Sequence, residues 1–203
     1  MRRDGLLVDF GGVLTTNVFD AFADFCRAEG LAPDTVRDRF MTDPGARALL
    51  GDLETGRIGE AEFEPRFAEL LSVERSEGLI DRLFAGMRPE ESMLDAVRAA
   101  RRSGVRTGLV SNSWGQERYD RAGFPELFDA VVISGEVGVR KPEPEIYALA
   151  VERLGLEPER IVFVDDLPGN LKPAAAIGMA TVLHRDAATT LEELERHLGV
   201  SLR

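Results

Sequence analysis

The sequence predicts an α/β protein with a doubly wound parallel sheet that carries helices on both faces. Short apolar runs typical of buried strands occur at five places, and segments with helical spacing of apolar residues, such as Glu91–Arg102 and Glu145–Leu154, alternate with them. Strands that alternate with helices form parallel sheets covered on both faces. The expected strands are Leu6–Val8, Val105–Val110, Val131–Ile133, Ile161–Val164 and Ala180–Leu183.

A long insertion follows the first expected strand. Residues 17–87 contain no convincing strand, although a crossover between parallel strands needs only about a dozen residues. We therefore expect an all-helical cap subdomain over 17–87, inserted into a core of residues 1–16 and 88–203. Its turns are marked by Gly30, Pro33, Pro44 and the stretch TGRIG. Its expected helices lie in VFDAFADFCRAEG, PDTVRDRF, GEAEFEPRFAELL and SEGLIDRLFAGM.

Composition excludes several classes of function. The net charge of -11 argues against nucleic acid as a partner, because binding to a polyanion depends on basic surface. The single cysteine, Cys26, permits no intramolecular disulfide and favours a reducing, cytoplasmic setting. Arg2 and Arg3 precede an apolar run that Asp9 breaks too early for a secretory leader, and no stretch is long enough to span a bilayer. We expect a monomer or homodimer that acts on a small molecule away from membranes.

Polar side chains follow four of the expected strands. Because the carboxyl ends of parallel strands meet at one edge of a sheet, where ligands of such folds bind, these side chains are expected to share one pocket. Lys141 is one of only two lysines among 25 basic residues, which indicates a need for a compact ammonium group there. The clustered residues are Asp9, Ser111, Asn112, Lys141, Asp165 and Asp166.

This combination matches what a phosphoryl group needs from an enzyme that attacks it with a carboxylate. Several carboxylates cannot approach a phosphate dianion without a counter-ion, and a hard divalent cation held by few protein oxygens solves that problem. Mg²⁺ is the natural candidate. Lys141 would neutralise the remaining phosphate charge, while Ser111 and nearby backbone N–H groups would hold the phosphate oxygens.

Each cluster also has a purely structural explanation. Asp9 can simply end a strand, and Lys141 can lie solvated in a surface turn before a proline-led helix. Ser113 with Gln116 can form a capping box, and Asn170 can cap the helix that follows it. Two adjacent acids at a strand end repel one another unless a cation holds them, so all four structural explanations together are a poor account of the sequence.

The motifs resemble those of the haloacid dehalogenase superfamily of phosphohydrolases. The family pattern has D-x-D-G-x-[LV] at the first strand, Ser or Thr after the second, and a Lys ahead of a later helix. After the fourth strand it has an acidic pair or Gly-Asp, with a further Asp or Asn. Here DFGGVL begins at Asp9, LVSNS contains Ser111, GVRKPEPEIY contains Lys141, and VDDLPGN contains Asp165, Asp166 and Asn170. The stretches ETGRIGEAEFEPRFAELL and VDDLPGNLKPAAAIGM are most similar to the branch with α-glucose-1-phosphatase and the phosphatase domain of epoxide hydrolases.

The resemblance implies a Rossmann-like core, a helical cap that closes over the substrate, and a role for each residue. Asp9 would form an aspartyl-phosphate, and Ser111, Asn112 and Lys141 would bind the phosphate. Asp9, the Gly11 carbonyl and Asp166 would ligate Mg²⁺. Asp165 and Asn170 would support that site. The substrate would be a small phosphorylated metabolite, similar to a sugar phosphate.

Gly11 departs from the family pattern. Most family phosphatases have a second Asp there, which protonates the leaving alcohol and later activates water, and glycine keeps only the backbone carbonyl. A positioned acid–base group contributes about 10²–10⁴-fold to the rate. Aryl and glycosyl phosphates should therefore react faster than alkyl ones, and a product burst is expected.

Two other functions remain open at this stage. A metal-independent 2-haloacid dehalogenase also lacks the second Asp, although the acidic pair at Asp165 and Asp166 disfavours it. A catalytically impaired pseudo-phosphatase could serve as a binding or regulatory module. Trp114 follows the Ser111 motif and either lines the pocket or packs structurally.

Overall fold

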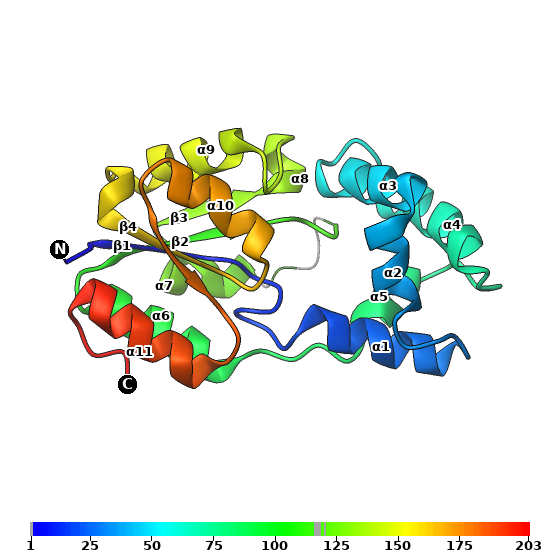
Figure 1. Cartoon of the computed structure of the whole chain (residues 1–203), viewed down its shortest axis with the longest axis horizontal. Coiled ribbons are helices and arrows are strands. Elements are labelled where there is room, and N and C mark those ends of the chain that lie inside the picture. The colour runs from blue at the N-terminus through cyan, green and yellow to red at the C-terminus, as the bar shows by residue number, and fades with distance from the viewer. Residues whose placement is uncertain (1, 116–118, 120) are drawn as a thin grey trace.

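The structure, a computed structural model, describes residues 2–115, 119 and 121–203. Its five-stranded sheet has the order β3-β2-β1-β4-β5, and every pair is parallel (Figure 1). The α/β class with a parallel sheet is confirmed, and the strand ends differ from the expected ones by no more than one residue. The strands are β1 Gly5–Val8, β2 Arg106–Ser111, β3 Ala130–Ile133, β4 Ile161–Asp165 and β5 Ala180–Leu183.

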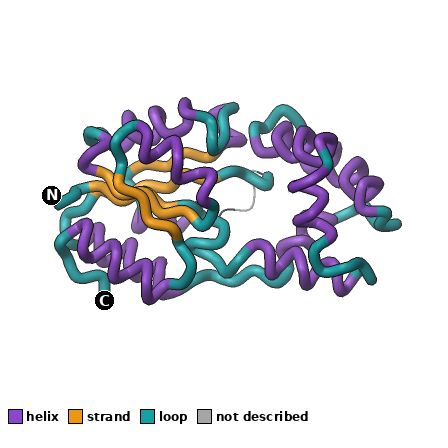
Figure 2. The backbone as a smooth tube through the Cα atoms, viewed as in Figure 1, coloured by secondary structure: helices purple, strands orange, loops and turns teal. Residues whose placement is uncertain are grey.

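Helices cover both faces of this sheet (Figures 1 and 2). Alternate strand residues divide between two apolar clusters, so that Leu6 and Val8 face one way and Leu7 the other. Both clusters are buried, which explains why the strands are continuous apolar runs. One face carries α9 Pro144–Leu154 and α10 Pro168–Ala176, and the other carries α6 Glu91–Arg102, α7 Phe124–Leu127 and α11 Ala187–Leu198. Short elements are η2 Arg121–Gly123, α8 Ser134–Val137 and η3 Pro158–Arg160.

Five helices between β1 and α6 pack against one another beyond the carboxyl edge of the sheet (Figure 1). We call these helices the cap. They enclose an apolar cluster that is separate from the two clusters of the sheet and includes Phe22, Phe63 and Leu83. This packing supports a subdomain over 17–87. The cap helices are α1 Val18–Ala28, α2 Thr35–Thr42, α3 Pro44–Glu54, α4 Glu60–Leu71 and α5 Leu79–Phe84.

Helix α3 is a structural element that the sequence analysis did not predict. Pro44 was interpreted only as a turn, whereas it is the first residue of the helix, where its missing N–H is not needed. The Asp43 carboxylate caps the same end, because its Oδ1 accepts hydrogen bonds from the N–H groups of Gly45 and Ala46 at 2.7 and 3.1 Å. Helix α3 matters for the site because it ends at Glu54.

The two segments that join cap and core lie side by side. The Thr16 N–H donates to the Arg88 carbonyl at 2.8 Å, and the Arg88 N–H donates to the Thr16 hydroxyl at 3.1 Å. The Glu90 N–H also donates to the Leu14 carbonyl at 2.9 Å. The cap therefore leaves and rejoins the core at one paired connection.

Over the described ranges, no helix has the length and apolar character needed to cross a bilayer.

Candidate active site

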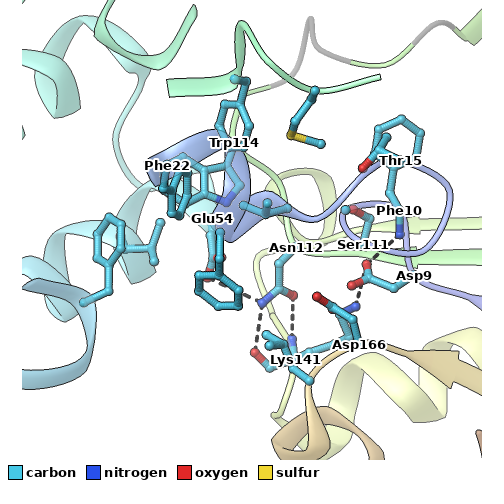
Figure 3. Close-up of a pocket in the computed structure, with 18 of the residues that line it drawn as sticks. Asp9, Phe10, Thr15, Phe22, Glu54, Ser111, Asn112, Trp114, Lys141 and Asp166 are labelled. Carbon is cyan, nitrogen blue, oxygen red and sulfur yellow. Dashed lines mark hydrogen bonds and ion pairs between the residues drawn. The ribbon is translucent and has the colours of Figure 1, made fainter. Parts of the chain in front are cut away.

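The residues singled out from the sequence meet at the carboxyl edge of the sheet. Asp9 follows β1 directly, Ser111 is the last residue of β2, and Asp165 is the last residue of β4. A cavity of about 790 Å³ opens between this edge and the cap (Figure 3). Of the predicted site residues, all but Asp165 line it: Asp9, Gly11, Ser111, Asn112, Lys141, Asp166 and Asn170. Asp165 is fully buried beside them.

Lys141 is the central cation of the site. Its Nζ lies 2.7 Å from Asp9 Oδ1 and 2.7 Å from Asp165 Oδ2, and its side chain is 1% exposed. Burial lowers the Lys141 pKa, but the charges of Asp9 and Asp165 outweigh it and raise the pKa above its ordinary value. Lys141 is therefore a permanently charged group rather than a solvated residue of a surface turn.

The carboxylate of Asp165 is saturated by protein donors. Its Oδ2 accepts from Lys141, its Oδ1 accepts from the Leu167 N–H at 2.8 Å, and the Asn170 amide lies 3.0 and 3.1 Å from the two oxygens. Asn170 sits inside α10 and uses its side chain on Asp165, so the interpretation of Asn170 as a helix cap is wrong. Asp165 and Asn170 therefore hold the neighbouring side chains of the site in position.

Asp9 and Asp166 offer oxygen atoms that suit a hard divalent cation. Carboxylate oxygens of Asp9, Asp165 and Asp166 all lie within 4.8 Å of one another. Burial raises the pKa of Asp9 to about 8 against the pull of Lys141, and burial together with the Asp165 charge raises the pKa of Asp166 to about 6. The single positive charge of Lys141 does not balance the negative charges of three carboxylates. The site therefore has both the excess negative charge and the oxygen ligands that suit Mg²⁺.

Gly12 makes room for this arrangement. Its φ of +75° lies in the left-handed region, and a Cβ placed on it would lie 2.4 Å from Asp166 Oδ2. Any side chain at position 12 would therefore displace the carboxylate that faces the cavity. The second glycine of DFGGVL is thus explained by the approach of Asp166 to the nucleophile loop.

Ser111 and Asn112 are held by neighbours that the sequence did not indicate. The Ser111 hydroxyl shares a hydrogen bond of 2.9 Å with the Tyr119 hydroxyl. The Asn112 side chain forms two hydrogen bonds with the backbone of Lys141, donating to its carbonyl at 3.0 Å and accepting from its N–H at 2.8 Å. The Asn112 amide therefore positions Lys141 (Figure 3). Of the proposed capping box, Gln116 lies outside the described residues, and Ser113 bonds with Gly115.

Glu54 brings the cap into contact with the core, and sequence reasoning missed it. Its carboxylate pairs with Arg140, lies 3.5 Å from the Asn112 amide, and is almost fully buried. The Ser134 hydroxyl of the core also donates to the Glu54 carbonyl. The only signals in the sequence were the position of Arg140 beside Lys141 and the start of ETGRIG at Glu54.

Gly56 permits this close contact between cap and core. Its φ is +71°, and a Cβ there would lie 2.6 Å from the Gly135 carbonyl oxygen. Since that oxygen belongs to the backbone of α8, a side chain at position 56 would push the end of α3 away from the core. The turn after α3 is therefore part of the site's architecture.

Gly11 has neither of the constraints that apply to Gly12. Its backbone is not left-handed, and a Cβ there would meet one atom, Val18 Cγ2, at 3.1 Å. A small shift of the Val18 side chain would accommodate a larger residue. Glycine at position 11 is therefore not required by the loop's conformation, and the site has no carboxylate at this position.

Comparisons with known proteins agree with this geometry. A family model described as haloacid dehalogenase-like hydrolase matches residues 4–178. Bifunctional epoxide hydrolase 2 of Sus scrofa is 35% identical over 131 residues, which cover 61% of this chain and 24% of that protein. The chain thus spans only about a quarter of that relative's length.

A second relative and a solved structure match this chain over a larger share of their own length. Glyceraldehyde 3-phosphate phosphatase of Methanopyrus kandleri is 34% identical over 135 residues, which cover 64% of this chain and 56% of that protein. A HAD family enzyme of Bacteroides thetaiotaomicron, solved as a magnesium complex, superimposes with a TM-score of 0.70 at 23% identity, over 91% of this chain and 94% of that one. This last likeness shows the shared fold.

We predict that Glu54→Gln changes how stability depends on pH. Burial raises the pKa of Glu54 from 4.5 to about 7, although Arg140 opposes the shift. Between these pH values the folded protein keeps a proton that the unfolded chain loses, so this residue makes stability fall as pH rises from about 4.5 to about 7. The free energy of unfolding of Glu54→Gln should therefore fall less over this pH range than that of the wild type. Urea unfolding at a series of pH values measures this difference.

Glu62→Gln, at an exposed position of α4, controls for the loss of one carboxylate from the cap. Its profile should follow that of the wild type. Parallel stability profiles for the wild type and Glu54→Gln between pH 4.5 and 7 would contradict the assignment.

Proposed function

Because the chain belongs to the haloacid dehalogenase-like hydrolase family, we propose that it is a Mg²⁺-dependent phosphoric monoester hydrolase that forms an aspartyl-phosphate on Asp9. The observation that carries this proposal is the contact of the buried Lys141 ammonium with both Asp9 and Asp165 at 2.7 Å. That contact keeps a carboxylate at the cavity wall, with Asp166 beside it. A phosphatase of this class needs this arrangement of nucleophile and fixed positive charge.

Asp9, Asp166 and the backbone carbonyl of Gly11 are the groups that would hold Mg²⁺. The cation supplies charge that offsets the negative phosphate and keeps the nearby carboxylates ionised. Asp165 keeps its hydrogen bonds to Lys141, Leu167 and Asn170 and so fixes the position of the loop that follows β4. A likeness in fold to a protein solved with magnesium supports the choice of metal.

The first step transfers the phosphoryl group to Asp9. Oδ1 is held by Lys141 and by the Phe10 N–H at 2.7 Å, so we assign Oδ2 as the attacking atom. The bond from Oδ2 to phosphorus forms as the bond from phosphorus to the leaving oxygen breaks. Ser111 and Lys141 hold the phosphate oxygens while charge moves onto the leaving group.

The second step hydrolyses the aspartyl-phosphate. Water attacks phosphorus, inorganic phosphate departs, and the Asp9 carboxylate is restored. Since Gly11 supplies no acid or base, the leaving alkoxide takes its proton from water in the first step, and water is not activated by residue 11 in the second. Both steps should be slower than in an enzyme with a second Asp.

The phosphatase among the relatives supports a small phosphorylated metabolite as substrate. A leaving group similar to a sugar, a cytoplasmic location and a monomeric or homodimeric state stay predictions. No contact within the described residues favours the dehalogenase, and the complete set of Asp9, Ser111, Lys141 and Asp166 supports an active enzyme over a pseudo-phosphatase.

We predict that p-nitrophenyl phosphate is hydrolysed only with Mg²⁺ and that Asp9→Asn abolishes phosphate release. The amide cannot attack phosphorus, so the loss should reach the detection limit of a phosphate assay. Chelation of the metal should stop the reaction, and addition of Mg²⁺ should restore it.

Asp20→Asn on the exposed face of α1 is the matched control and should keep full activity. Chloride release from a 2-haloacid without metal would favour the dehalogenase. Absence of turnover with intact Mg²⁺ binding would favour the pseudo-phosphatase, and either result overturns the proposal.

We predict that Gly11→Asp accelerates hydrolysis of alkyl phosphates more than that of aryl phosphates. Alkoxides need protonation as they leave, and a positioned acid contributes about 10²–10⁴-fold. The ratio of the aryl to the alkyl rate, measured at saturation, should therefore fall by at least about tenfold. Gly11→Asp combined with Val18→Ala removes the 3.1 Å contact and should give the larger effect.

Gly11→Asn occupies nearly the same space without an acid and should leave the ratio near the wild-type value. If Gly11→Asp and Gly11→Asn behave alike, the missing carboxyl group does not limit the reaction.

A further inference from the structure

The cavity extends from the catalytic carboxylates into a wall of aromatic rings supplied mainly by the cap. Trp114 lies at its centre, with ring centroids 5.6 Å from Phe22, 5.7 Å from Phe40 and 5.0 Å from Phe84. All four residues line the cavity. Figure 3 shows Trp114 and Phe22 beside each other, apart from the group of Asp9, Lys141 and Asp166.

Exposed apolar side chains gather at the same cavity. Among the described residues, the large hydrophobic side chains that are exposed are Phe19, Met41, Leu167 and Ile177, at 36, 67, 40 and 37%. The first three line the cavity and Ile177 does not. Exposed apolar side chains that cluster in a concave site mark a surface that binds an apolar group.

These side chains come from both sides of the cavity. Phe19 belongs to α1 and Met41 to α2 of the cap, while Leu167 directly precedes α10 of the core. A group bound between them would contact cap and core together. Its far end would lie on apolar side chains, while its phosphate would lie near Asp9 and Lys141.

Several of the polar side chains that line the cavity are already paired with other groups of the protein. Glu54 is paired with Arg140, and Asn112 is bonded to the backbone of Lys141. Arg37 is paired with Asp38 on α2 and with Asp34, the residue before that helix. A polyhydroxylated leaving group needs a hydrogen-bond partner for each hydroxyl that loses water, whereas the phenylalanine rings of the wall supply none and the indole of Trp114 supplies a single N–H donor.

We propose that this apolar part of the cavity binds the leaving group, and that the substrate is a phosphate monoester whose alcohol carries an aromatic ring. The inference rests on the proposed phosphatase function and narrows its substrate class. Ring faces and edges of Phe and Trp pair favourably with another aromatic ring, which favours a flat ring over a flexible chain. An aromatic leaving group differs from the sugar-like leaving group that the resemblance to the family implies.

The test compares three esters that all release a primary alcohol, so that leaving-group reactivity is matched: 2-(1-naphthyl)ethyl phosphate, n-hexyl phosphate and glucose 6-phosphate. With Mg²⁺ present, kcat/KM for the naphthyl ester should exceed that for glucose 6-phosphate by at least about tenfold. An equal or higher value for glucose 6-phosphate would overturn the inference. An equal value for hexyl phosphate would overturn its aromatic part.

Two variants separate the cavity from general effects on the fold. Phe19→Ser should raise KM for the naphthyl ester several-fold more than it raises KM for glucose 6-phosphate. Ile177→Ser removes an equally exposed side chain outside the cavity and should change neither value. Equal effects of the two variants on the naphthyl ester would contradict the inference.

Calorimetry with Asp9→Asn tests binding without turnover. With Mg²⁺ present, this variant should bind the naphthyl ester at least about tenfold more tightly than glucose 6-phosphate. If no ester is hydrolysed by the wild type, including p-nitrophenyl phosphate, the phosphatase proposal fails, while the binding comparison still decides the nature of the cavity. Equal affinities would overturn the aromatic leaving group even if hydrolysis is observed.

Discussion

The site depends on one buried ammonium group. Lys141 lies between Asp9 and Asp165, and without its charge these two buried carboxylates at the ends of adjacent strands would repel one another. Because Asp165 is also saturated by Leu167 and Asn170, it anchors Lys141 and takes no further ligand. Asp9 and Asp166 are left to face the cavity. The proposed roles of Asp9 as nucleophile and of Asp9 and Asp166 as ligands of Mg²⁺ both rest on this division between the acids.

The segment that carries Lys141 also connects the core to the cap. Asn112 bonds the backbone of Lys141, and Glu54 at the end of α3 pairs with Arg140, the residue before Lys141. The position of the cap is therefore coupled to the position of the cation through contacts that do not pass through the substrate. The cap also supplies Phe22, Phe40 and Phe84 of the aromatic wall. The part of the chain proposed to select the leaving group is therefore held against the loop proposed to bind the phosphate. Such an arrangement suits a lid that excludes water during the reaction.

Much of this architecture could be predicted because it follows from simple patterns. The strands are apolar runs buried on both faces, and parallel pairing brings Asp9, Ser111 and Asp165 to one edge whatever the details of packing. The motifs around Asp9, Lys141 and Asp166 indicated the family, which the match over residues 4–178 confirms. The pairing of side chains could not be predicted in the same way. The motif VDDLPGN does not indicate which of its two acids pairs with Lys141. The contacts of Glu54, Arg140 and Tyr119 could not be predicted either, because they join residues that are far apart in the sequence. Helix α3 was missed because Pro44, Gly45 and Gly51 lower helix propensity, whereas the Asp43 cap and the packing of Leu49 and Leu53 decide its structure.

The most direct test of the account is to find where the phosphoryl group goes. The protein is mixed with Mg²⁺ and p-nitrophenyl phosphate, the reaction is stopped in acid within the first turnover, and the peptides are analysed by mass spectrometry. We expect one added phosphoryl group on the peptide that contains Asp9. It should form in step with the first release of p-nitrophenol and accumulate, because Gly11 supplies no base for its hydrolysis. Release of p-nitrophenol and phosphate with no phosphoryl group on Asp9 at any time would contradict it.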